Sequence, residues 1–243
     1  MSSQRFIAGA IPERYVEVDA ARLLLILCEF SEPNGDALKA EPFFPTRPTV
    51  KHFTPEYYLQ KLDFLVRYPG YLAYEIVELH RLGVPAAAKR EEVIGEVGAI
   101  LKNREPELRT KPFRRFWFGA HERLNDVEAW WHSRGLVFIG LERRSDGKPQ
   151  KYYFLTDEAV TVVAQLIATV DHARWYQRRI ELIKRFFGDL PPSKLKSLQY
   201  SHPQYRQAQL SRSIPDLPLD DVIAHFQKVM GHTLQIPRKQ PHA

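Results

Sequence analysis

The distribution of apolar residues along the chain predicts a mainly helical protein. Several apolar-rich segments are bounded by helix-capping residues, proline or glycine. The helices expected on this basis cover residues 20–30, 54–67, 70–82, 89–102, 193–200 and 218–230. Asp19, Thr54 and Ser193 are the expected N-caps of three of them. Residues 31–50 contain four prolines and therefore predict a loop.

A helix followed by a β-hairpin is predicted in the middle of the chain. The apolar residues of the helix have helical spacing: Leu124, Val127, Trp130 and Trp131. Gly135 fits the position after a helix where left-handed backbone is needed. Strands are expected over residues 136–144 and 151–155, joined by a turn at Ser145-Asp146-Gly147-Lys148. Thr156 then caps a second helix. We expect Leu124, Val127, Leu136 and Phe154 in the core, and one of the adjacent tryptophans partly exposed.

This order of elements resembles a winged helix, a helix-turn-helix variant with a hairpin as its wing. The residues "RGLV…YYFLT" resemble the GLI…YxLT signature found in many winged helices. The resemblance implies fold rather than function, because some winged helices bind DNA and others bind only proteins. The candidate DNA-binding residues flank the turn or lie in the basic aromatic stretch before the helix: Arg143, Arg144, Lys148, Lys151, Arg114 and Arg115.

Residues 157–187 predict one long helix with a continuous apolar stripe. Thirty helical residues would extend roughly 45 Å. Such a helix could dimerise or dock on a partner coiled coil, or it could be kinked and pack on the N-terminal helices. Both alternatives are compatible with the sequence.

Charge is unevenly distributed along the chain. The whole chain has a net charge of +6, while residues 172–212 contain nine Lys or Arg and two Asp or Glu, a net of +7. This excess suggests an acidic partner, either nucleic acid or a protein, although a solvated basic face would have the same composition. The candidate residues of this partner or DNA interface are Arg174, Arg178, Arg179, Lys184, Arg185, Lys194 and Lys196.

Three short motifs resemble a known family. "KLDFLVRYP" (61–69), "RFWFGAHE" (115–122) and "KLKSLQYSHPQY" (194–205) are similar to motifs of the middle component of ABC-three-component, Lamassu-type anti-phage systems. The second motif departs from the family pattern, since Ala120-His121-Glu122 replaces Pro-Trp-Asp. The resemblance implies a non-enzymatic adaptor that joins an SMC-like ATPase to an effector nuclease. The residues themselves predict a core stripe in the first motif and an Asp63–Arg67 pair on the helix surface.

The sequence offers little support for catalysis. Asp146-Gly147-Lys148 is better explained as a turn than as part of a nuclease site. The nine histidines form no metal-binding pair, and no P-loop or nucleophile motif is present. We therefore expect no catalytic residue, metal or cofactor. The alternative to the adaptor is a homodimeric winged-helix transcriptional regulator that binds DNA.

The sequence also predicts where the protein works and how it is organised. The lone Cys28 is expected in the core, and it suggests a cytoplasmic protein without an internal disulfide. No segment has the length and apolarity of a membrane span. The expected fold class is mainly α with a small β-hairpin. The expected regions are N-terminal helical (1–110), winged-helix (111–170), basic C-terminal helical (171–234) and a disordered tail (235–243).

Overall fold

The computed structural model describes residues 16–102, 113–116, 119–207, 212–234 and 236. The chain is mainly helical with a small antiparallel sheet, as predicted. In the first half, the helices are α1 (Val16–Phe30), α2 (Asp36–Lys39), α3 (Glu56–Arg67), α4 (Pro69–Arg81), the 3-10 helix η1 (Pro85–Ala87) and α5 (Arg90–Lys102). In the second half they are α6 (Asn125–Ser133), α7 (Asp157–Thr169), α8 (Asp171–Phe187), α9 (Pro192–Ser201), α10 (Pro203–Gln207) and α11 (Leu219–Met230).

The main sheet has four antiparallel strands in the order β1-β2-β6-β5. These strands are β1 (Glu32–Pro33), β2 (Lys51–Phe53), β5 (Val137–Arg143) and β6 (Pro149–Leu155). A separate hairpin pairs β3 (Arg114–Phe116) with β4 (Gly119–His121). Since β2 pairs with β6, the sheet joins segments about a hundred residues apart in the chain. The sheet is therefore larger than the single hairpin that the sequence predicts.

Residues 31–50 are more ordered than the predicted loop. They contain β1 and α2, and their aromatic residues cover one face of the sheet. The Phe43 ring lies 4.9 Å from Tyr152, and the Phe44 ring lies 4.9 Å from Phe154. A Cβ atom at Gly140 would be 2.5 Å from the Phe43 carbonyl oxygen, so only glycine permits this close approach.

The hairpin and the helices around it form the predicted core. Leu124, Val127, Leu136 and Phe154 are all buried, as expected. Trp131 is fully buried and donates its indole N–H to the Ala20 carbonyl at 3.2 Å, which ties α6 to α1. Its neighbour Trp130 is half-buried, as expected for adjacent residues on a helix. Cys28 is also half-buried, and burial raises the pKa of its thiol to about 12.

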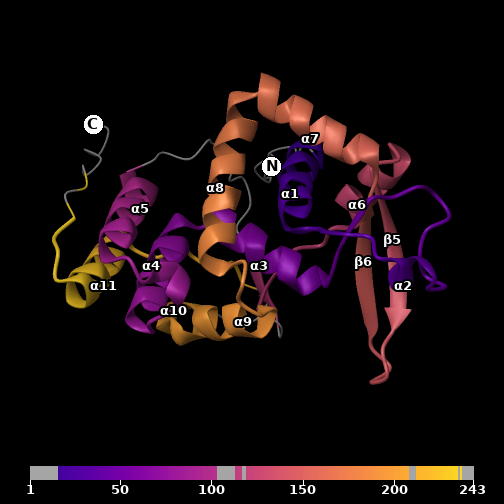
Figure 1. Cartoon of the computed structure of the whole chain (residues 1–243). Coiled ribbons are helices and arrows are strands. Elements are labelled where there is room, and N and C mark those ends of the chain that lie inside the picture. Colours follow the sequence, from indigo (N-terminus) through magenta and orange to yellow (C-terminus); the bar gives the residue numbers. More distant parts are fainter. Residues whose placement is uncertain (1–15, 103–112, 117–118, 208–211, 235, 237–243) are drawn as a thin grey trace, which may run out of the picture.

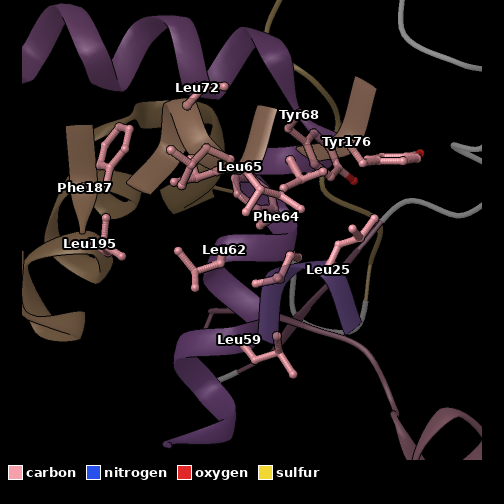
Figure 2. Close-up of a cluster of buried hydrophobic side chains, with 14 of the residues drawn as sticks. Leu25, Leu59, Leu62, Phe64, Leu65, Tyr68, Leu72, Tyr176, Phe187 and Leu195 are labelled. Atoms are coloured by element: carbon pink, nitrogen blue, oxygen red, sulfur yellow. The ribbon is translucent and has the colours of Figure 1, made fainter. Parts of the chain in front are cut away.

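The largest part of the core surrounds α3, ten of whose twelve residues are buried. Figure 2 shows Leu59, Leu62 and Leu65 of α3 among side chains from other helices, including Tyr176 and Phe187 of α8 and Leu195 of α9. One hydrophobic cluster includes residues from α1 to α11. The pairing of β2 with β6 and the shared core both cross the region boundaries expected at residues 110 and 170. The division of the chain into separate regions stays a prediction. The tail over 235–243 lies outside the described residues, apart from Ile236.

The single long helix predicted over residues 157–187 is wrong. The chain breaks at Val170, whose φ of −117° and ψ of 116° are extended, and α8 begins at Asp171. No proline or glycine marks the break. Arg174 donates to the Ile167 and Ala168 carbonyl oxygens at 3.2 and 3.0 Å and so caps the end of α7. The break lets α7 pack on α1 while α8 turns to pack on α1 and α3 (Figure 1). The alternative of a kinked element packed on the N-terminal helices is confirmed.

The three predicted side-chain caps also differ from the structure. Asp19 lies inside α1, which begins at Val16, and it pairs with Arg22 at 2.7 Å. Thr54 donates its hydroxyl to the Lys151 carbonyl oxygen at 3.0 Å, because β2 holds it against β6. Ser193 lies within the first turn of α9, after Pro191 at the N-cap. In contrast, Thr156 accepts from the Ala159 N–H at 3.2 Å, as predicted.

Candidate nucleic-acid and protein interface

The β5–β6 hairpin carries three of the four expected wing residues on its surface. Arg143, Arg144 and Lys148 are exposed near a tip that extends away from the helices (Figure 1). The turn is fixed by Gly147, whose φ of 76° is left-handed, and by the Lys148 N–H, which donates to Asp146 Oδ1 at 3.1 Å. These three cations are therefore available to a partner, although Asp146 lies 4.0 Å from Arg144 and partly offsets them.

Lys151 does not belong to this exposed group, so the prediction that it flanks the turn as an exposed cation is wrong. Its side chain is 23% exposed, and its Nζ lies 2.7 Å from Glu56 Oε2 and 2.8 Å from Glu128 Oε1. Burial lowers the pKa of Lys151, but hydrogen bonds to the two carboxylates outweigh burial and the pKa is raised. Glu128 also accepts from the Tyr153 hydroxyl at 2.8 Å. Helix α3 supplies Glu56 and helix α6 supplies Glu128. The spacing of residues in the sequence does not predict that either carboxylate contacts Lys151.

The helix before the hairpin, α6, contains no Lys or Arg. Asp126 is exposed, whereas Glu128 is half-buried and bound to Lys151. Arg123 and Arg134 are exposed on either side of the helix, and Arg134 stacks on the Trp130 ring at 4.0 Å. Helix α6 itself therefore offers no Lys or Arg to the phosphates of DNA. The backbone of Arg114 and Arg115 lies in β3, but their side chains lie outside the described part of the chain.

Two residues of the basic C-terminal segment pair with acids from the N-terminal half. Lys184 pairs with Glu29 at 3.0 Å, and Arg185 pairs with Glu92 at 3.1 Å and with Glu96. Arg174 pairs with Asp171, and its remaining contacts cap α7. The uneven charge along the sequence is thus partly balanced in three dimensions, because α8 lies beside α1 and α5.

The other four basic candidates differ in exposure. Arg179 is 5% exposed and stacks on the Trp175 ring at 4.9 Å, so little of its side chain is accessible to a partner. Arg178, Lys194 and Lys196 are exposed. Arg178 shares one face of α8 with Arg174 and Arg185, as their spacing predicts.

A groove of about 380 Å³ separates α5 from α8. Its charged lining combines both signs: Arg178, Arg179, Arg185, Glu96 and Glu181. Trp175 and Leu182 supply apolar surface. The mixture of charges does not favour phosphate or nucleic acid in this groove.

Residues of the first and third motifs of the family resemblance meet at Phe64, and the second motif joins the first through Glu122. Phe64, from the first motif, lies 5.6 Å from Tyr205 of the third motif and 5.8 Å from Phe113, two residues before the second. Tyr68 donates its hydroxyl to the Ile214 carbonyl oxygen at 3.1 Å and accepts from the Phe113 N–H at 2.9 Å. The motifs therefore build one packing centre rather than three separate surfaces.

Asp63 and Arg67 pair in the interior and not on the helix surface, so that expectation is corrected. Asp63 is 1% exposed and accepts from Arg22 at 2.6 Å, while Arg67 reaches it at 3.4 Å. Arg67 also pairs with Glu122 at 2.8 Å. Burial alone would lower the pKa of Arg22, but Asp63 and Asp19 outweigh burial and raise it.

The same network fixes the second motif to the first. The Gln60 side chain donates to the Glu122 carbonyl oxygen at 2.8 Å and accepts from the Glu122 N–H at 3.0 Å. Together with the Arg67 ion pair, these bonds join α3 to the segment entering α6. Glu122 replaces aspartate of the family pattern and still supplies a carboxylate at this junction.

Among the described residues, no three His, Cys, Asp or Glu side chains are grouped as metal ligands would be. Within the same part of the chain, no helix is both long enough and apolar enough to cross a membrane. Comparisons with protein families, curated proteins and solved structures found no match.

Proposed function

We propose that this chain is a non-catalytic winged-helix adaptor in an SMC-like ATPase defence complex, where it bridges the ATPase and an effector nuclease. The observation that carries the proposal is that the three motifs pack together: Phe64 of the first contacts Tyr205 of the third, and Arg67 of the first pairs with Glu122 of the second. Motifs far apart in the sequence that form one packing centre are more informative together than separately. Their joint presence supports a shared architecture with the family that they resemble.

The order of the elements supports the winged-helix part of the proposal. The elements α1, β2, α3, α6, β5 and β6 follow as helix, strand, helix, helix, strand and strand. The sheet places β6 between β2 and β5. This order is similar to that of winged helices, and in this interpretation α4, α5 and the β3–β4 hairpin are an insertion between the second and third helices.

The charges around the wing favour a protein partner over sequence-specific DNA. In DNA-binding helix-turn-helix proteins the second helix of the motif enters the major groove. The corresponding helix here is α6, which contains an exposed Asp126 and no Lys or Arg. Lys151 is already held by two carboxylates. Arg143, Arg144 and Lys148 remain available for phosphates of DNA held by the complex.

Purification of the tagged full chain from its native cells tests the adaptor. We expect an SMC-like ATPase and a nuclease to co-purify in fixed ratio. A matched variant, Phe64→Ala, disrupts the packing centre, whereas the exposed Arg143→Ala leaves it intact; only the first should reduce co-purification. Isolation of the wild-type chain without an ATPase would contradict the adaptor.

The alternative is a homodimeric winged-helix regulator, and the exposed wing cations are the observation that favours it. A regulator would protect an operator sequence from nuclease when purified alone. Replacing Arg143, Arg144 and Lys148 with alanine would then weaken binding and flatten its salt dependence, by a slope of about 0.9 per lost phosphate contact.

A further inference from the structure

Strand β5 is an open edge of the main sheet. It pairs only with β6 in the described part of the chain, and Figure 1 shows it on the side of β6 away from α3 and α8. Edge strands are usually short, bulged, charged, interrupted by proline or covered, because their free backbone groups attract other strands. The opposite edge follows this rule, since β1 has two residues and ends in Pro33. Strand β5 has seven residues in continuous register with β6, and its two charges, Glu142 and Arg143, are at its end.

The register shows which backbone groups of β5 are free. The Arg144 N–H donates to the Lys148 carbonyl oxygen at 3.2 Å, so the even-numbered residues of β5 bond to β6. The backbone groups of Ile139, Leu141 and Arg143 therefore point toward the open edge. No hydrogen bond from elsewhere in the described chain reaches them. Three successive outward positions provide the donors and acceptors that an added strand needs.

Apolar side chains accompany these free backbone groups. Leu141 is 60% exposed, more than any other large apolar side chain that the structure describes. Ile139 lies on the same face of the strand and is half-buried against the core. A strand added beside β5 would cover both side chains.

A groove of about 490 Å³ adjoins the first half of this edge. It is lined by Phe138 and Ile139 of β5, by residues 45–47 and by the end of α6. Residues 45–47 belong to the segment that covers one face of the sheet, and α6 covers the other face, so the groove opens at the edge between the two layers. Its charged side chains are Arg47 and His132, both exposed, and no described acid lines it. The groove therefore favours a carboxylate.

We propose that an extended segment of a partner protein adds to β5 as a fifth strand of the sheet, with an acidic side chain in the groove. Backbone hydrogen bonds to the outward groups provide the affinity, as in other cases of strand addition. Apolar side chains of the segment cover Ile139 and Leu141, and a carboxylate meets Arg47. Strand addition at β5 is independent of whether the partner is an ATPase or a nuclease.

The charges at the two ends of β5 oppose a second copy of this chain as the occupant. Two β5 strands related by a two-fold axis would run antiparallel. The tip of one copy, with Arg143 and Arg144, would then lie beside the start of the other, with Arg47 and His132. Like charges in such positions are destabilising. Nucleic acid would meet the cations but would leave Leu141 exposed.

Selection from a displayed library of peptides of about twelve residues, enough for one strand, tests the proposal with the full chain as bait. We expect enriched peptides with alternating apolar or β-branched residues and with Asp or Glu toward one end. Amide hydrogen exchange of the chain saturated with an enriched peptide then locates the site. The amides of Ile139, Leu141 and Arg143 should exchange about tenfold more slowly or less. Those of Gly140 and Glu142, already directed at β6, should change little.

Two variants with matched controls separate the contributions of backbone and charge. Leu141→Pro removes an outward N–H, which an edge strand tolerates on its solvent side, so the fold should persist while peptide affinity falls by about tenfold or more. Leu141→Thr keeps the N–H and should bind within about threefold of the wild-type chain. Arg47→Glu leaves β5 intact and should also weaken binding, whereas Lys228→Glu, at an exposed position of α11, should not. Titration calorimetry measures the affinities, and circular dichroism measures the fold.

The same measurements identify the results that contradict strand addition. A library without binders overturns the proposal, and so do peptides that bind Leu141→Pro and Arg47→Glu as tightly as the wild-type chain. Dimerisation that Leu141→Pro abolishes would assign the edge to a second copy. Loss of DNA binding in Arg47→Glu without loss of peptide binding would assign the groove to phosphates. Either of these two results also overturns the proposal.

Discussion

Helices α3 and α8 are both amphipathic and both carry acids and bases, but their charges lie in different environments. On α3, Lys61, Asp63 and Arg67 are between 1% and 7% exposed. On α8, Arg178, Lys184 and Arg185 are at the surface. The apolar residues of both helices face the same core. The comparison shows that helical spacing identifies the apolar face, while the packing of neighbouring helices decides whether the remaining faces are buried.

The difference has an energetic consequence. A buried charge depends on its partner, because removal of one member leaves the other in the interior without compensation. A surface ion pair contributes little, because water already solvates both groups. Substitutions on α3 should therefore have much larger effects than the same kinds of substitution on α8.

The largest effect is expected at Asp63. Replacement by alanine removes the carboxylate shared by Arg22 and Arg67 and leaves them with Asp19 and Glu122 alone, which should lower the free energy of unfolding by up to about 3–5 kcal/mol. Chemical denaturation measures this change. The control is Asp36→Ala, which removes an exposed partner of Lys39; it should change stability by less than about 0.5 kcal/mol. Similar effects of the two variants would mean that α3 is not the centre of the core.

A smaller effect, dependent on pH, is expected at Lys61. Burial lowers the pKa of Lys61 to about 8, and the attraction of Glu75 only partly opposes this. Between about pH 8 and 10.5 the unfolded chain holds a proton that the folded chain has lost, so stability should rise with pH in this window. Lys61→Met should remove the rise, because it removes the group that titrates in this window. Thermal denaturation at pH 7, 8 and 9.5 measures the slope in both proteins. A rise that persists in Lys61→Met would show that Lys61 is not its source.

The sequence predicts features that depend on local contacts better than features that depend on distant contacts. The hairpin, Gly135, Gly147 and the Thr156 cap were predicted because each depends on residues within a few positions. The pairing of β2 with β6 depends on segments a hundred residues apart. The break at Val170 depends on the packing of distant helices, because α7 packs on α1 while α8 changes direction and packs on α1 and α3.

The candidate interface was predicted only in part for the same reason. Arg143, Arg144 and Lys148 are exposed because the hairpin tip has few neighbours. Lys151 and Arg185 meet acids from distant helices, which composition and spacing cannot reveal. The burial of Asp63 likewise follows from the packing of α1 against α3. Nothing in the sequence indicates that Arg22 of α1 pairs with Asp63.

On α8, Arg185 and Arg178 provide a matched pair with small expected effects. Arg185→Glu places a third acid beside Glu92 and Glu96 and should lower stability by up to about 1 kcal/mol. The loss should shrink in high salt, because the charges are exposed. Arg178→Glu, on the same face, should change stability by less than about 0.5 kcal/mol. Denaturation at low and high salt measures both, and equal losses would show that the α5–α8 ion pairs contribute nothing specific.

Titration of the free, full-length chain with duplex DNA tests the adaptor most directly. Lys151, Lys184 and Arg185 are paired with carboxylates, α6 contains no Lys or Arg, and the exposed basic candidates of the described residues are spread over the wing and helices α8 and α9. At physiological salt we therefore expect only weak binding that does not depend on sequence, with a Kd of about 10⁻⁴–10⁻⁶ M. Binding of one operator sequence with a Kd of about 10⁻⁸ M or lower would contradict the adaptor and support the regulator.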